Sequence, residues 1–322
     1  MAPISDFAAF EAGWAAGRNQ LVHARLAADL DTPVSVMMKL TDAGRDSFIL
    51  ESVTGGDVRG RYSIIGCKPD LVWECHGTQS RLNRSARYDR DAFEPCSAPP
   101  LEALRALLAE SAIDMPDDLP AAAAGLFGYL GYDMIRLVEH LPQPNPDPLG
   151  LPDAVLIRPS VIAVLDGVKG EVTVVAPAWV ASGLSARAAY AQAAERVSDA
   201  LRDLERAPAS ASREIGETQA AADPVSNFAR ADYLAAVERA KDYVRAGDIF
   251  QVVPSQRWTQ DFPDPPFALY RALRRTNPSP FMFFFNFGPF QVVGASPEIL
   301  VRVFGGQVTI RPTRRTRPRG AT

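Results

Sequence analysis

Short apolar and β-branched runs, separated by glycine, aspartate and lysine, recur through the first two-thirds of the chain. Such runs, bounded by turn-forming residues, predict short strands. The predicted strands cover residues 33–40, 47–54, 61–65, 70–75, 125–132, 154–165 and 171–176. Their spacing is not that of βαβ units, in which a helix separates successive parallel strands. The pattern therefore predicts an α+β fold rich in antiparallel sheet.

Four segments repeat their apolar residues with the period of a helix: residues 7–14, 99–108, 185–205 and 233–244. In the first, Phe7, Phe10 and Trp14 stand at i, i+3 and i+7, which predicts a short amphipathic helix. The last segment is followed by Gly247, in the position of the left-handed residue that often closes a helix.

Residues 207–224 differ in composition from the rest of the chain. They are rich in Ala, Ser, Glu and Gln, contain two prolines, and predict an exposed linker. We therefore expect an N-terminal domain at 1–206 and part of a second domain at 225–322. The later predicted strands cover residues 249–258, 281–287 and 291–294, and Gly305-Gly306 separates two final short strands.

Composition narrows the functional class. The chain has 34 Lys and Arg against 38 Asp and Glu, so its net charge of −4 argues against a general nucleic-acid binder. No apolar run reaches the length of a membrane span, and no signal peptide pattern opens the chain. The three cysteines form no CxxC pair, which argues against a zinc site. We expect a cytoplasmic protein that binds neither nucleic acid nor membrane.

The usual catalytic motifs, such as GxGxxG, GxxxxGK[ST], HExxH and GxSxG, are absent from the sequence. Gly125, Gly128 and Gly131 recur every third residue within an aromatic strand. We interpret them as positions of close backbone approach rather than as a nucleotide-binding loop.

Three segments could still bind a ligand, each with a simpler alternative. Glu51 and Ser52 at a strand end could bind an amine, or could form an exposed strand edge. The aromatic block 281–285 could line a pocket, or could be a buried strand. Five arginines in 311–319 could meet a carboxylate, or could be a solvated basic tail.

Five specific sequence motifs are more informative than these patterns. The chain contains LES at 50–52, GYLGYDMIR at 128–136, GDIFQVVPSQR at 247–257, NPSPFMFF at 277–284 and GASPE at 294–298. Together and in this order they closely resemble anthranilate synthase component I, a family of chorismate-utilising enzymes. The resemblance runs from about residue 31 to the last residue.

The resemblance implies a reaction and its partners. Ammonia, delivered from glutamine by a separate amidotransferase subunit, adds to C2 of chorismate, and loss of pyruvate leaves anthranilate. In that family Mg²⁺, held by glutamates, neutralises a substrate carboxylate. The family's catalytic residues and magnesium ligands have no counterpart up to Thr322, so we expect a C-terminally truncated chain without turnover of its own.

The resemblance also implies feedback inhibition by L-tryptophan. Glu51 and Ser52 are expected at the amino and carboxylate groups of the effector, with Pro280, Phe281 and Met282 beside its indole. Arg61 is expected to approach the same site. Because effector and substrate sites are distinct, inhibition requires two conformations with different affinities.

Single positions separate the members of the superfamily. Isochorismate and salicylate synthases carry a water-activating lysine where this chain has Gln251, and an amide cannot act as a general base. Thr316 keeps a threonine that contacts chorismate in the family. Arg315, however, replaces a glycine whose bare backbone approaches the substrate, so its side chain is expected to clash.

Two alternatives remain open at this point. Arg314 is neither the alanine of anthranilate synthases nor the lysine of aminodeoxychorismate synthases, so the chain could be a fragment of an aminodeoxychorismate synthase component I. It could also be a non-catalytic remnant that binds tryptophan or a partner subunit.

Overall fold

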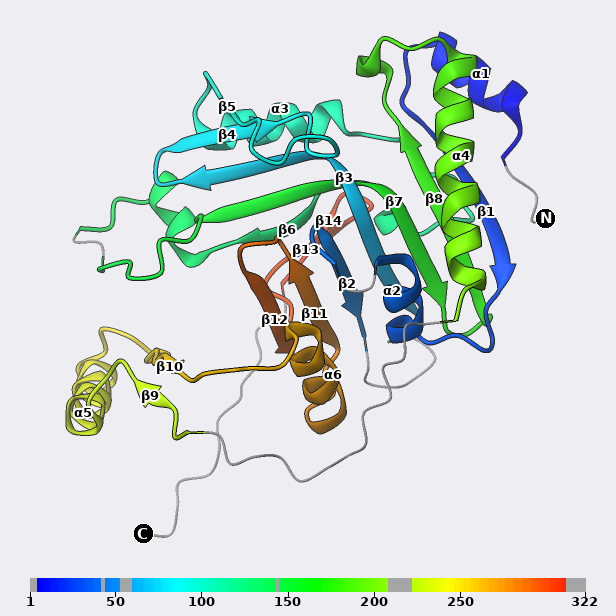
Figure 1. Cartoon of the computed structure of the whole chain (residues 1–322). Helices are drawn as coiled ribbons and strands as arrows, with labels where there is room; N and C mark the ends of the chain where they lie inside the picture. Colours follow the sequence, from blue (N-terminus) through cyan, green and yellow to red (C-terminus); the bar gives the residue numbers. More distant parts are fainter. Residues whose placement is uncertain (1–4, 42–43, 53–59, 143–144, 208–221, 311–322) are drawn as a thin grey trace. The chain divides into compact units, whose positions relative to one another are not determined.

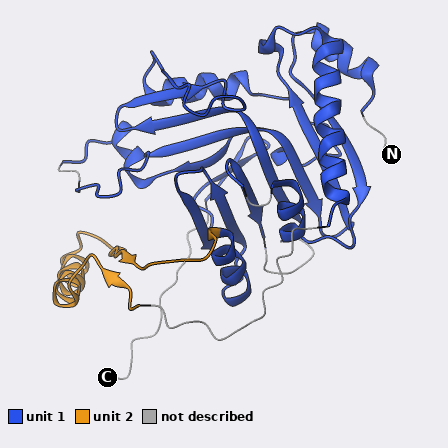
Figure 2. Ribbon diagram, in the orientation of Figure 1, with its two compact units in different colours: residues 1–210, 267–322 blue, residues 211–266 orange. Residues whose placement is uncertain are grey.

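The computed structural model describes residues 5–41, 44–52, 60–142, 145–207 and 222–310. The chain divides into two compact units, one formed by residues 1–210 and 267–322 and the other by residues 211–266 (Figure 2). Each unit is described by itself below.

The first unit is built on a ten-stranded antiparallel sheet (Figure 1). Its main path runs in the order β1-β8-β7-β3-β2-β11-β12, with β6 beside β7, β4 beside β3 and β5 beside β4. The strands are β1 Gln20–Ala27, β2 Ser47–Glu51, β3 Tyr62–His76, β4 Gln79–Asn83, β5 Glu94–Pro95, β6 Phe127–Leu130, β7 Ala154–Asp166, β8 Glu171–Ala178, β11 Phe281–Asn286 and β12 Gln291–Ser296. The predicted α+β, antiparallel-rich fold is confirmed.

The central strand β3 joins two segments that the sequence predicted as separate strands. Lys68 has a φ of 52°, and the pairing of β3 with β7 shifts between Pro69 and Leu71. The chain therefore bulges at this point instead of turning, and one strand continues across it.

Four helices contribute to the main core of this unit, and α3 packs in a separate cluster. The helices are α1 Phe7–Ala15, α2 Pro33–Thr41, α3 Pro100–Glu110, α4 Ala186–Glu205 and α6 Pro266–Thr276, with short 3₁₀ turns at Ala121–Ala123, Tyr132–Leu137 and Val180–Ser182. Helix α4 lies along β8 and β1 (Figure 1) and buries Ala189, Ala193, Val197, Ala200 and Leu204. These mostly small side chains allow a close approach to the sheet.

The strand predicted at residues 33–40 is wrong, because these residues form helix α2. Thr32 and Ser35 exchange backbone-to-side-chain hydrogen bonds of 2.9 and 3.0 Å, in the manner of a capping box, and Pro33 fills the first helical position. Val36, Met37 and Leu40 then face the core. The β-branched residues suggested a strand, but the capping hydrogen bonds of Thr32 and Ser35 stabilise the start of a helix.

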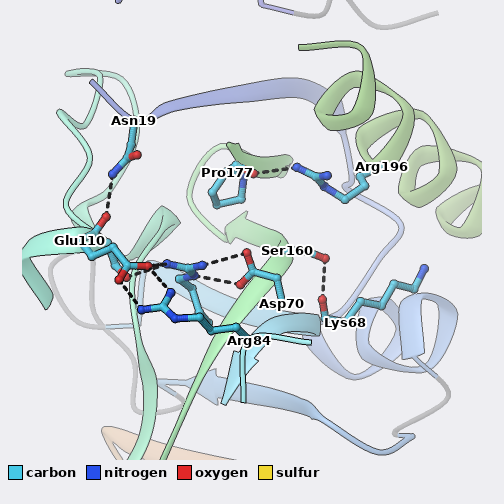
Figure 3. Close-up of polar contacts among 10 residues, drawn as sticks. Asn19, Lys68, Asp70, Arg84, Glu110, Ser160, Pro177 and Arg196 are labelled. Atoms are coloured by element: carbon cyan, nitrogen blue, oxygen red, sulfur yellow. Dashed lines mark hydrogen bonds and ion pairs between the residues drawn. The ribbon is translucent and has the colours of Figure 1, made fainter. Parts of the chain in front are cut away.

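A polar network around the buried Arg158 ties α3 to the sheet. Arg158 on β7 donates to Asp70 on β3 at 2.9 and 3.2 Å, and to Ser111 at 3.1 Å. Arg84 makes two hydrogen bonds of 2.6 and 2.7 Å to Glu110 at the end of α3 (Figure 3). The guanidinium of Arg84 holds the pKa of Glu110 below its ordinary value.

The second unit contains helix α5 Arg230–Ala246 and a short ladder of β9 Val225–Ser226 with β10 Trp258–Thr259. Gly247 closes α5 with a φ of 83°, as predicted. The strand predicted at 249–258 is wrong except at its last residue, where β10 begins. Pro254 lacks the N–H that a central strand requires.

Strands β13 Arg302–Phe304 and β14 Gln307–Thr309 form the predicted pair around Gly305-Gly306. Within the described residues, no helix combines the length and the apolar character needed to cross a membrane.

The compact units do not coincide with the expected division into residues 1–206, a linker at 207–224 and a second part at 225–322. The β11–β12 hairpin joins the sheet of the first unit because β11 pairs with β2. The division into domains at 1–206 and 225–322 therefore stays a prediction.

Candidate functional site

Two motifs that lie more than 200 residues apart in sequence meet at the pairing of β2 with β11. Met282 on β11 stands directly opposite Glu51 on β2, and Ser63 on β3 flanks Glu51 on its other side. The sheet therefore places the LES motif at 50–52 against the NPSPFMFF motif at 277–284.

The pleat of the sheet divides the candidate residues between its two faces. Glu51 and Met282 are directly opposite and so share a face. Met282 is buried in the main core, whereas Phe281 must point to the other face and is 43% exposed. Pro280 and Ser52 are partly buried beside the strand ends.

The Glu51 carboxylate is almost completely buried, with 3% of its side chain exposed. The hydroxyl of Tyr270 donates to its Oε2 at 2.8 Å. Arg274 donates to both oxygens, from Nε to Oε2 at 2.7 Å and from Nη2 to Oε1 at 2.5 Å. A buried carboxylate needs such partners, because an unpaired buried charge is strongly destabilising.

Both donors come from α6, where they stand four residues apart on one face. Hydrogen bonding to Glu51 raises the pKa of the Arg274 guanidinium. Burial is the main cause that raises the pKa of Tyr270, and the neighbouring charge of Glu51 adds to it. The arginine therefore stays charged and the tyrosine keeps its proton for Glu51.

Aromatic packing fixes α6 over this face of the sheet. Phe267 and Tyr270 stack with ring centroids 5.5 Å apart, and Phe267 meets Phe284 of β11 edge-on at 5.1 Å. Tyr270 is fully buried. The helix that supplies the donors is thus held by the same strand that carries Met282.

Arg61, which was expected near the same site, is engaged elsewhere. Its guanidinium donates to Asp166 from Nε at 3.0 Å and from Nη2 at 2.7 Å, and it stacks over the ring of Tyr62. Hydrogen bonding from Arg61 lowers the pKa of Asp166. The structure shows no contact between Arg61 and Glu51.

Sequence reasoning missed Tyr270 and Arg274, and it assigned no helix to residues 266–276. The spacing of Phe267, Tyr270 and Arg274 at i, i+3 and i+7 is a helical signal that was available. Nothing in the spacing, however, indicates that their partner is Glu51, 219 and 223 residues away.

The expected chorismate contacts Thr316 and Arg315 lie outside the described residues. Within the part of the chain that the structure describes, no group of three or more His, Cys, Asp or Glu side chains is arranged to hold a metal ion. We therefore assign no magnesium ligand.

A family model described as "chorismate binding enzyme" matches residues 68–322. The chain belongs to this family of chorismate-binding enzymes. The match covers most of the chain and includes both β11 and the helix α6 that holds Glu51.

Individual relatives of this chain agree with the motifs. It is 73% identical over 319 residues to anthranilate synthase component 1 of Cereibacter sphaeroides, a match that covers 99% of this chain and 64% of that protein. The protein of the same name from Pseudomonas aeruginosa is 43% identical over 298 residues, covering 91% of this chain and 59% of that one.

A solved structure has the same fold. The crystal structure of anthranilate synthase component I from Streptococcus pneumoniae superposes with a TM-score of 0.64 at 28% identity, covering 88% of this chain and 59% of that chain. These findings confirm the resemblance read from the motifs. The chain spans less than two-thirds of the length of each of these proteins.

Proposed function

We propose that this chain supplies the matched part of an anthranilate synthase component I, a protein that forms anthranilate from chorismate and ammonia; the chain by itself is expected to have no turnover. The observation that carries the proposal is the 73% identity over 319 residues to a protein of that name. Gln251 supports it as well, because a glutamine cannot activate water as the lysine of isochorismate-forming relatives does.

In the proposed reaction, ammonia forms a bond to C2 of chorismate, and water and pyruvate leave to give the aromatic product. A glutamine amidotransferase subunit is the proposed source of the ammonia. Mg²⁺ would neutralise a substrate carboxylate, but no residue of this chain is assigned to it. The three free cysteines fit a cytoplasmic location.

We further propose that L-tryptophan binds at the β2–β11 pair as a feedback effector. Glu51 would take its ammonium group, Ser52 its carboxylate, and Pro280, Phe281 and Met282 would lie beside the indole. The direct pairing of Glu51 with Met282 supports this proposal, because it places the expected ammonium acceptor beside one of the apolar residues of the site.

A chimera tests the proposed reaction. This chain replaces its matched region in the Cereibacter sphaeroides protein, in one form as it stands and in another with Arg314→Ala and Arg315→Gly. Because a side chain at 315 replaces the family's glycine, we expect anthranilate only from the second form, at a rate at least about 100-fold above the first. Anthranilate fluorescence with chorismate, Mg²⁺ and ammonia measures it.

The Cereibacter sphaeroides protein assayed alongside is the positive control. A folded second chimera that releases isochorismate, or that consumes no chorismate while the control is active, would overturn the proposed function. Equal anthranilate formation by both chimeras would refute the role given to position 315 and leave the function standing.

A further inference from the structure

The Glu51 carboxylate is held by groups that the motifs did not include. A carboxylate offers about four lone-pair sites on its two oxygens. In the described residues Oε2 accepts from Tyr270 and from Nε of Arg274, whereas Oε1 accepts only from Nη2 of Arg274. Donors from the described residues therefore fill three of the four sites, and the fourth, on Oε1, has no donor among those residues.

We propose that Arg274 and Tyr270 are positioning residues, which hold Glu51 so that the second lone pair of Oε1 receives the ammonium group of an amino-acid effector. The inference rests on the effector site proposed above and goes beyond it by naming what orients its carboxylate. The fork of Arg274 fixes the plane of the carboxylate, which a single donor could not do. Tyr270 fixes which oxygen remains available.

The same helix links the two parts of the site. Helix α6 ends at Thr276, and the N–H of Asn277 still bonds to the carbonyl of Leu273 at 2.8 Å. The chain then reaches Ser279, whose hydroxyl bonds to the carbonyl of Ser296 on β12, before it enters β11. A shift of Arg274 on binding would therefore move the segment that precedes Phe281.

Two ligands distinguish positioning from a general structural role. L-tryptophan carries the ammonium group, and indole-3-propionate is the same molecule without it. Calorimetric titration of the full chain with each gives the preference for the amine as a ratio of dissociation constants. Arg274→Gln removes the charged fork, Arg274→Lys keeps the charge, and Tyr270→Phe removes the second donor.

We expect Arg274→Gln to lower the amine preference by about tenfold or more, with indole-3-propionate affinity changed by less than about twofold. Tyr270→Phe should lower the amine preference by about threefold. The amine preference of Arg274→Lys should lie between those of Arg274→Gln and the unaltered chain, because lysine keeps the charge. Arg275→Gln, the same change at an exposed neighbour in the last turn of α6, should leave the ratio unaltered.

Each other outcome is decisive. If Arg274→Gln weakens both ligands alike, the residue is only structural, and if it tightens tryptophan binding, Arg274 competes with the amine. Either result overturns the positioning role while the effector site stands. If the unaltered chain shows no preference for tryptophan over indole-3-propionate, the effector site itself fails and the positioning role fails with it.

Discussion

Replacing Glu51 with glutamine should weaken L-tryptophan binding by roughly 30- to 150-fold, or about 2–3 kcal/mol, because a charge-assisted hydrogen bond in a buried site is lost. The amide has the shape of the carboxylate, and its single oxygen can still accept from Tyr270 and from Nε of Arg274. Its NH2 group cannot accept from Nη2 of Arg274, so circular dichroism of the variant checks that α6 stays in place. Calorimetric titration of the full chain measures the change.

Glu171→Gln is the matched control for this substitution. Glu171 lies on β8, where it is partly exposed and 3.7 Å from Arg25, and it does not touch β2 or β11. Its loss should leave tryptophan affinity within about twofold of the unaltered chain. Equal affinities of the Glu51 variant and the unaltered chain would contradict the proposed ammonium contact.

A second large effect is expected on stability. Gly128→Ala should lower the free energy of unfolding by about 3 kcal/mol or more, and the melting temperature by roughly 6–12 °C. A Cβ at Gly128 would lie 1.9 Å from the carbonyl oxygen of Val155, which is backbone of the paired strand β7. Neither strand can move away without breaking the hydrogen bonds that pair β6 with β7. Thermal unfolding followed by circular dichroism measures it.

Gly167→Ala provides the comparison. A Cβ there would be 3.5 Å from the carbonyl oxygen of Arg61, an ordinary contact, in a backbone conformation that other residues adopt. The melting temperature should then change by no more than about 2 °C. A Gly128 variant as stable as the Gly167 variant would show that β6 does not approach β7 this closely.

These glycines also show what the sequence could reveal about backbone geometry. Gly128 and Gly131 are positions of close approach, as predicted, since a Cβ at Gly131 would lie 2.8 Å from the carbonyl oxygen of Asp153. Gly125 is different: it has open space around it but a φ of 129° that favours glycine. Recurrence alone could not separate these two reasons for a glycine.

Local signals predicted local structure well. Ser185 caps α4, Gly247 closes α5, and both helices follow the apolar spacing that predicted them. Helix α2 was missed because its β-branched residues were weighed without the Thr32–Ser35 capping pair before them. Propensity is a weak guide when a cap and a core contradict it.

The site was predictable only in part. The motifs singled out Glu51 and Met282, but their pairing across β2 and β11 depends on the register of the sheet. A short sequence motif does not show which residue of another strand it will face. Tyr270 and Arg274 were invisible for the same reason, because their roles come from tertiary contacts with Glu51. Only the fold brings these residues together.

Hydrogen exchange followed by mass spectrometry, with and without saturating L-tryptophan, tests the central claim most directly. A bound ligand makes local unfolding of the strands that it contacts less frequent, which slows the exchange of their amide hydrogens. We therefore expect slower exchange in peptides covering residues 47–52 and 277–286, and unchanged exchange in β13 and β14. The Glu51→Gln variant should lose this protection. Tryptophan that binds without slowing exchange in β2 and β11, or that protects another part of the chain instead, would contradict an effector site at this pair of strands.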